Sequence, residues 1–117
     1  MQLIENRNLL LVTLKEPFIE WIFTSNPTLK VSEDKIIHHK AVYLVKDLET
    51  ITQKSIAHLI KNNYQKIFIH ELWSWNTNES LWPETDLSTF NEWLSVEHLE
   101  VCYDLLNSPI FKMELFA

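Results

Sequence analysis

The chain has 117 residues, of which 46% are hydrophobic, enough for one domain with its own core but not for two. Its 16 acidic residues outnumber its 10 basic residues, which gives a net charge of −6. Binding to a phosphate backbone has no electrostatic support at this charge, so we expect no nucleic-acid partner.

The complete lack of glycine argues against several kinds of catalytic site. Phosphate-binding loops, dinucleotide-binding turns and nucleophile elbows need backbone at positive φ or very close to a ligand, which glycine permits at little energetic cost. Nucleotide-dependent chemistry is therefore not expected, and the sequence predicts no cofactor.

Targeting signals are also absent from the sequence pattern. Cys102 is the single cysteine, so no internal disulfide can form, as is usual in reducing compartments. The apolar run at residues 9–12 is short, follows charged residues and lacks a small-residue cleavage site, unlike a secretory signal. No stretch approaches the roughly 20 apolar residues of a membrane span. We expect a cytoplasmic protein with no membrane partner.

In chain order, the first predicted element is a strand over residues 8–14, which are apolar and bounded by charge. Pro17 then suits the first turn of a helix, where its missing N–H would have no partner. The helix is expected to end at Asn26, because the proline that follows disfavours helical backbone. Its apolar stripe has helical spacing and consists of Phe18, Trp21 and Ile22.

The middle of the chain predicts one strand and one long helix. A short helical turn is expected at residues 32–36, and the β-forming residues 40–46 predict a strand. A capping box at residues 50–53 begins a helix that extends to Asn76. Weak helix formers at residues 61–63 predict a kink or a break in this helix.

The last third predicts a loop at residues 76–85, a helix with Asp86 as its N-cap, and a strand over residues 96–105. The helix stripe consists of Leu87, Phe90, Trp93 and Leu94. The strand alternates, with Leu99, Val101, Tyr103 and Leu105 on one side and His98, Glu100, Cys102 and Asp104 on the other. One polar face is typical of an antiparallel or edge strand.

The resulting order, β-α-β-α(α)-α-β, predicts an α+β fold of two layers, with helices on one face of a small, partly antiparallel sheet of about three strands. We assign residues 1–106 to a single domain. Residues 107–117, named here the C-terminal segment, are unusually apolar for a chain end. Such a segment either docks on its own domain or contacts another chain.

Several motifs within residues 7–105 resemble a group of small bacterial proteins of unknown function. The most specific motif is Glu-Ser-Leu-Trp-Pro at residues 79–83. The others are Pro-Phe-x-x-Trp from residue 17, Ala-x-Tyr-Leu-Val from residue 41, Phe-x-x-Trp from residue 90, Val96-Glu97 and Asp104-Leu105. The resemblance implies a cytoplasmic, single-domain protein and transfers no catalytic residue. The chain departs from the group in its C-terminal segment and in having lysine where the group's middle helix is more acidic, at Lys54, Lys61 and Lys66.

Two patterns contain metal-ligand residue types. Residues 70–74, His-Glu-Leu-Trp-Ser, begin like the zinc-protease motif but have serine in place of the second histidine. On the polar face of the predicted 96–105 strand, neighbouring side chains lie about 6.5 to 7 Å apart, so one strand supplies at most two ligands. The others would have to come from His38, His39 or Asp47. A solvated outer face accounts for the pattern more simply, and we predict no metal.

A thiol-dependent enzyme would need a base beside Cys102. His98 is four residues away, about 13 Å along the same predicted strand face, which exceeds hydrogen-bond reach. His38 or His39 on a neighbouring strand could supply the base instead. A small hydrolase or metal-dependent enzyme using His38/His39 with His98/Cys102 is therefore the alternative function.

Three of the five tryptophans fall in one short region, residues 71–83, which contains Trp73, Trp75 and Trp82. Side chains two residues apart on a helix point about 200° away from each other, so Trp73 and Trp75 cannot both face the core. We predict that Trp75 lies inside, in register with the apolar stripe, and that Trp73 is partly exposed. Large aromatic side chains can anchor a loop or bind a partner.

Together these features favour a non-enzymatic protein-interaction domain of unknown pathway that binds a protein partner or a second copy of itself. The excess of aromatic residues without a catalytic set and the apolar C-terminal segment are the reasons. The predicted partner-binding residues are Trp73, Glu79, Trp82, Phe111, Leu115 and Phe116. An acidic mimic of nucleic acid is allowed by the charge, but no dense acidic run supports it.

Overall fold

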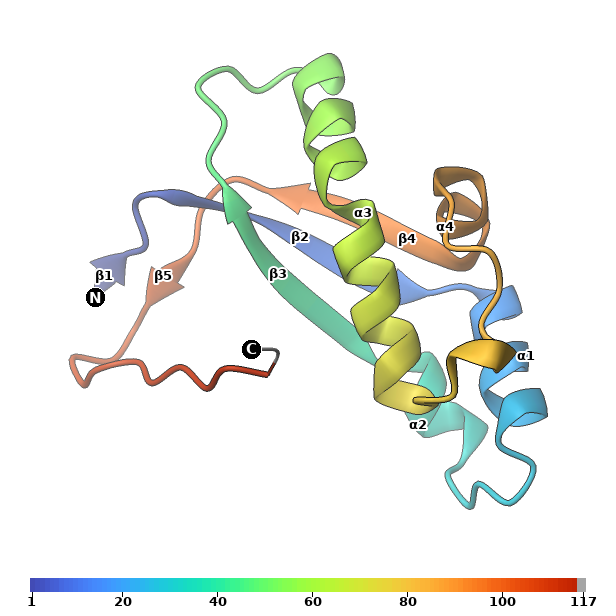
Figure 1. Ribbon diagram of the computed structural model, residues 1–117. Coiled ribbons are helices and arrows are strands. Elements are labelled where there is room, and N and C mark those ends of the chain that lie inside the picture. Colours follow the sequence, from blue (N-terminus) through green and yellow to red (C-terminus); the bar gives the residue numbers. More distant parts are fainter. Residues whose placement is uncertain (116–117) are drawn as a thin grey trace.

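The computed structural model describes residues 1–115 and contains a three-stranded antiparallel sheet (Figure 1). The strands are β2 (Arg7–Leu14), β3 (Lys40–Lys46) and β4 (Leu94–Leu99), in the order β3-β2-β4. Leu10 of the central strand pairs with Tyr43 on one side and with His98 on the other. Because directly opposed residues in a sheet share a face, this register determines which side chains face the helices.

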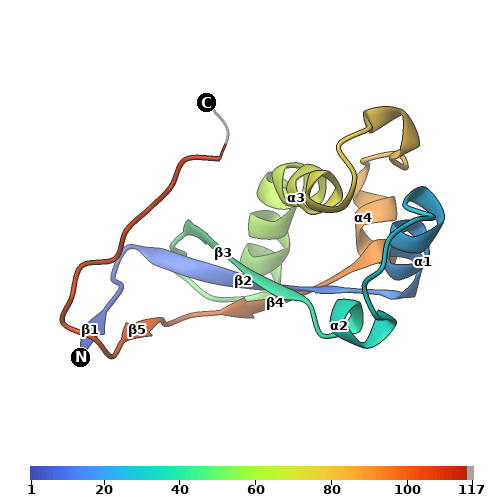
Figure 2. The ribbon, with the colours of Figure 1, turned by 90° about the horizontal axis from the view of Figure 1, so that it is seen from below.

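The helices form a second layer on one face of this sheet (Figure 2). They are α1 (Glu16–Ser25), α3 (Gln53–Trp75) and α4 (Leu87–Trp93), while the short α2 (Glu33–Ile37) lies at one end of the sheet. A single 3-10 turn, η1 (Glu79–Leu81), connects α3 with α4. The predicted α+β fold, with helices on one face of a small antiparallel sheet, is confirmed.

The core lies between the two layers and is rich in aromatic rings. Phe18 meets Trp93 with ring centroids 5.6 Å apart, and Phe68 meets Phe90 at 5.7 Å, both in edge-to-face arrangements. Phe18, Phe68 and Phe90 are fully buried. Rings of this size remove large apolar areas from water, so a few of them fill the centre of a small domain.

Two tryptophans hold the loop between α3 and α4 against this core. The indole N–H of Trp21 donates to the backbone oxygen of Leu81 at 2.8 Å, and that of Trp82 donates to the oxygen of Asn76 at 2.7 Å. A buried indole N–H normally finds an acceptor, and here both acceptors are loop backbone oxygens. The loop therefore has a fixed path although it contains no glycine.

Two predictions about helix α3, a break in its middle and the position of its N-cap, were wrong. The helix is continuous from Gln53 to Trp75, without the break predicted at residues 61–63. The amide of Asn63 donates to the Leu59 oxygen within the helix at 2.7 Å, and core packing outweighs weak local propensity. The N-cap is Thr52 and not Thr50: its hydroxyl accepts from the Ser55 N–H at 3.0 Å, and the Ser55 hydroxyl accepts from the Thr52 N–H at 2.9 Å.

The predicted strand over residues 96–105 is also corrected. It is divided into β4 and the two-residue β5 (Tyr103–Asp104), and β5 pairs with β1 (Gln2–Leu3) in a separate sheet. The apolar side of the predicted strand was expected to face the core. Three of its residues, Val101, Tyr103 and Leu105, are instead 50%, 56% and 73% exposed. Alternation marks two faces but does not say which of them the helices cover.

Within residues 107–115 the C-terminal segment forms no helix or strand. It is extended, and Phe111 is 91% exposed. Phe116, one of the predicted contact residues, lies outside the described residues. Among the described residues, no helix has both the length and the apolar character needed to cross a bilayer.

The position of the α3 cap can be tested by comparing two threonines. Replacing Thr52 by Ala removes the acceptor for the Ser55 N–H, so the free energy of unfolding should fall by about 1 kcal/mol. Thr50→Ala removes a hydroxyl that makes no such bond and serves as the matched control. Urea unfolding followed by circular dichroism measures both, and a larger loss for Thr50→Ala would contradict the assignment.

Candidate functional site

The most unusual group in the structure is the carboxylate of Glu71, which is 2% exposed although α3 has a solvent-facing side. Its Oε2 accepts a short hydrogen bond from the Tyr43 hydroxyl of β3. Its Oε1 lies 3.3 Å from Nε2 of His39, just before β3. A buried carboxylate is tolerated only when such donors replace water.

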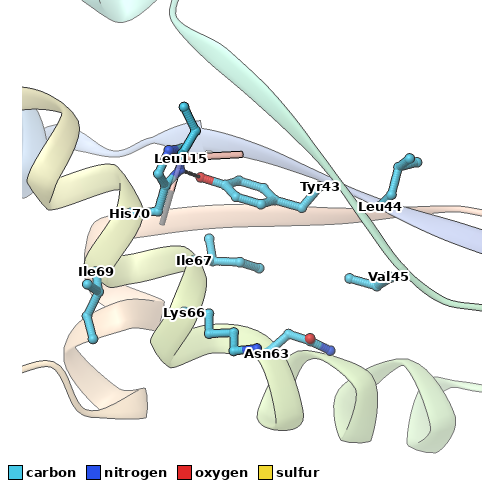
Figure 3. Close-up of a pocket in the computed structure, with 9 residues that line it drawn as sticks. All are labelled: Tyr43, Leu44, Val45, Asn63, Lys66, Ile67, Ile69, His70 and Leu115. Carbon is cyan, nitrogen blue, oxygen red and sulfur yellow. Dashed lines mark hydrogen bonds between the residues drawn. The ribbon is translucent and has the colours of Figure 1, made fainter. Parts of the chain in front are cut away.

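The Tyr43 hydroxyl also contacts His70, with its oxygen 2.7 Å from Nδ1 (Figure 3). Because the phenol proton is directed at Glu71, the phenol oxygen is the acceptor in this second bond, and Nδ1 of His70 carries the hydrogen. The four residues His39, Tyr43, His70 and Glu71, named here the polar cluster, form one chain of hydrogen bonds between α3 and β3.

This environment affects the acidity of Tyr43. Burial, then the hydrogen bond to Glu71 and finally the charge of Glu71 raise the pKa of the Tyr43 phenol above its ordinary value. All three effects disfavour the phenolate, which would lie beside another negative charge in a place with little water. Tyr43 therefore remains a neutral donor over the ordinary pH range.

Two tryptophans lie against the polar cluster. The ring of Trp75 packs edge-on against His39, with centroids 5.6 Å apart, and the ring of Trp73 stacks on His70 at 6.5 Å. Trp75 is partly buried against the core and Trp73 is 40% exposed. The prediction that Trp75 is the inner residue of this pair is confirmed.

A cavity of about 630 Å³ opens beside the polar cluster, between β3 and α3. Most of its lining is apolar, and the polar groups on its wall come from Tyr43, His70, Lys66 and Asn63. Its full set of lining residues is Tyr43, Leu44, Val45, Asn63, Lys66, Ile67, Ile69, His70 and Leu115 (Figure 3). This is the composition typical of a site for a small ligand.

The predicted partner-binding residues have different surroundings. Trp82 is partly buried and packs on the core, Glu79 is exposed on η1, and Trp73 keeps an exposed edge beside His70. Phe111 is almost fully exposed, and Leu115 lines the cavity although it is 55% exposed. These positions favour a mainly structural role for Trp82, and a role of any of these residues in partner binding stays a prediction.

The residues of the alternative enzyme site are not brought together. His38 lies 3.5 Å from Asp34, His39 pairs with Glu71, and His98 lies 2.9 Å from the side-chain oxygen of Asn8. His39 precedes β3 and His98 belongs to β4, on opposite sides of the central strand. Within residues 1–115, no three metal-ligating side chains are grouped so that they could hold an ion.

Tyr43 and Glu71 were not identified from the sequence, although one signal was present. Glu71 lies four residues after Ile67 and four before Trp75, inside the apolar stripe of α3. A carboxylate at such a position must find donors on the facing element. His70, the neighbouring residue, lies at the edge of this stripe and contacts Tyr43 there.

No family model matches this chain, and neither a curated protein nor a solved structure matches it.

The structural importance of the polar cluster can be measured with Tyr43→Phe. The substitution keeps the ring but leaves the buried Glu71 carboxylate without its phenol donor, so the free energy of unfolding should fall by about 1–3 kcal/mol. Tyr103→Phe, on the exposed side of β5, is the matched control and should leave stability nearly unchanged. Equal urea midpoints for Tyr43→Phe and the wild type would contradict the hydrogen-bonding role.

The raised pKa of Tyr43 also predicts a dependence of stability on alkaline pH. As the pH rises, the unfolded chain releases this proton before the folded chain does. The contribution of protonated Tyr43 is therefore fully present below its ordinary pKa of 10 and is lost as the pH rises above it. Urea unfolding from about pH 9 to about pH 11 should show a steeper loss for the wild type than for Tyr43→Phe. Equal slopes would contradict this assignment.

Proposed function

We propose that the protein is a non-enzymatic, cytoplasmic interaction domain that self-associates, with the C-terminal segment of one copy packing on the open sheet face of the other. The observation that carries the proposal is the apolar character of the sheet face opposite the helices. On β3, Val42 and Leu44 are 51% and 52% exposed. Exposed apolar side chains gathered on one face are typical of an interaction surface.

The register of the sheet places further apolar side chains on this outer face. Leu11 of β2, which is partly buried, pairs directly with Val42, and Leu9, which is buried by its neighbours, pairs with both Leu44 and Leu99. No helix of the described residues covers this side (Figure 2). Sheets normally bury one face and hydrate the other with polar side chains, so a second face with apolar residues on all three strands favours a covering layer.

The edges of the sheet favour the same conclusion. In the order β3-β2-β4, the outer edge of β3 is not paired with any described strand. An edge of seven residues with exposed Val42 and Leu44 can accept another extended chain. The charged ends of β3, Lys40 and Lys46, limit pairing with arbitrary chains without preventing it.

The second copy of the chain is the occupant that fits this surface best. Its C-terminal segment is extended and carries Ile110, Phe111 and Met113, which are 64%, 91% and 81% exposed. The open face is basic at its borders, with Arg7, Lys40 and Lys46, and the C-terminal segment has one acidic side chain, Glu114, that could pair with them. Reciprocal exchange of this segment closes a symmetric dimer in which both apolar surfaces are covered.

The dimer can be tested by native mass spectrometry and by size exclusion with light scattering at about 100 μM, well above the dissociation constants of typical specific dimers. Leu44→Lys and deletion of residues 107–117 should each raise the dissociation constant at least tenfold, about 1.4 kcal/mol. Leu81→Lys adds the same charge at an apolar residue on η1 that is 45% exposed, and it should leave the mass unchanged.

A monomeric wild type under these conditions would overturn the proposal. So would a dimer that survives both the Leu44→Lys substitution and the deletion. Circular dichroism of each variant shows whether a change of mass reflects the interface or a loss of folding.

A further inference from the structure

We propose that the cavity between β3 and α3 is a binding site for a small organic carboxylate with an apolar body, such as a medium-chain fatty acid. Its volume of about 630 Å³ lies within the range of small-molecule sites. Two of its lining residues, Leu44 and Leu115, also belong to the proposed dimer surface, whereas its polar groups come from α3 and from the helix-facing side of β3.

One face of α3 supplies the groups that would recognise the ligand. Asn63, Lys66, Ile67 and His70 follow one another at the spacing i, i+3, i+4 and i+7, which places all four on the same side of the helix. Lys66 forms no ion pair with any carboxylate of residues 1–115. It is thus an uncompensated positive charge at the border of a mainly apolar cavity.

The body of the ligand would contact the apolar part of the wall, which consists of Leu44, Val45, Ile67, Ile69 and Leu115. Ile67 and Val45 are buried and form the inner part, whereas Leu115 comes from the exposed C-terminal segment. Burying an alkyl chain here removes its apolar surface from water, which favours binding. An apolar wall with one cationic border matches an amphipathic anion and disfavours an amphipathic cation.

The charge of the polar cluster does not cancel the positive charge of Lys66 at the cavity. Glu71 is the nearest carboxylate, but it is buried, does not line the cavity and is bonded to Tyr43 and His39. These two donors compensate the carboxylate, and Lys66 is the charged side chain that lines the cavity. The bond from Nδ1 of His70 to the Tyr43 oxygen fixes the imidazole ring at the wall of the cavity (Figure 3).

The experiment is a titration of the 117-residue chain with octanoate, monitored by calorimetry and by amide chemical shifts. A dissociation constant below about 1 mM is expected, which a ligand of this size reaches at ordinary ligand efficiency. Octanol and octylammonium have the same alkyl chain without the negative charge, and each should bind at least about tenfold more weakly. Shifts should centre on residues of β3 and α3 that line the cavity.

Two lysines on the same helix provide the matched variants. Lys66→Glu reverses the charge at the cavity and should weaken octanoate binding at least about tenfold, and Lys66→Gln should weaken it by a smaller factor. Lys61→Glu makes the same charge change one and a half turns away, outside the cavity lining, and should leave the affinity within about twofold.

Equal affinity for octanoate and octanol would overturn the proposal, as would octanoate binding that is unchanged in both Lys66 variants or absent at about 10 mM, well above the expected constant. Folding of each variant is checked by circular dichroism, which separates loss of the site from loss of structure. Lys66 is not part of the proposed dimer surface, so its two variants test ligand binding without changing the dimer contacts, and either proposal can fail while the other stands.

Discussion

The burial of the Glu71 carboxylate is the constraint on which the relation between α3 and the sheet depends. A carboxylate with 2% exposure requires donors wherever the backbone carries it. The Tyr43 hydroxyl and His39 supply them from β3 and from the residue just before it. Apolar contacts alone would let a long helix slide or rotate on a sheet, because they have little direction. Hydrogen bonds to one buried group select a single position along and around the helix axis.

This position determines what lies at the edge of the helix layer. Once Glu71 is directed inward at Tyr43, the neighbouring residue His70 must lie at the border, where the same phenol oxygen receives its Nδ1 hydrogen. Lys66, one turn earlier, shares that border. The cavity is therefore a consequence of how α3 is fixed: the helix meets β3 along Ile67 and Glu71 and leaves space beside Leu44. The residues that stabilise the fold also orient the groups that face the cavity.

Much of the fold could be predicted because its signals are local. Strands β2 and β3, the start of α1 at Pro17 and the Asp86 cap of α4 were predicted to within a residue or two, since each depends on neighbours in the sequence. The division of residues 96–105 and the polar cluster could not be predicted in this way. Tyr43 and Glu71 are 28 residues apart, and only the packing of α3 on the sheet brings them together.

The apolar residues on the outer face of the three-stranded sheet support the idea that this side is covered by protein. Apolar alternation on a strand indicates a buried face, yet Leu99 of β4 lies beside Leu9 on the side of the sheet that faces away from the helices. Leu11, Val42 and Leu44 show the same conflict on β2 and β3, where the helix-facing side is already filled by other residues. A sequence that places apolar residues on both faces of a thin sheet is suited to a fold with a third layer. Since the chain has no further helix within residues 1–115 to form that layer, the proposed third layer is the extended, apolar C-terminal segment of a second copy.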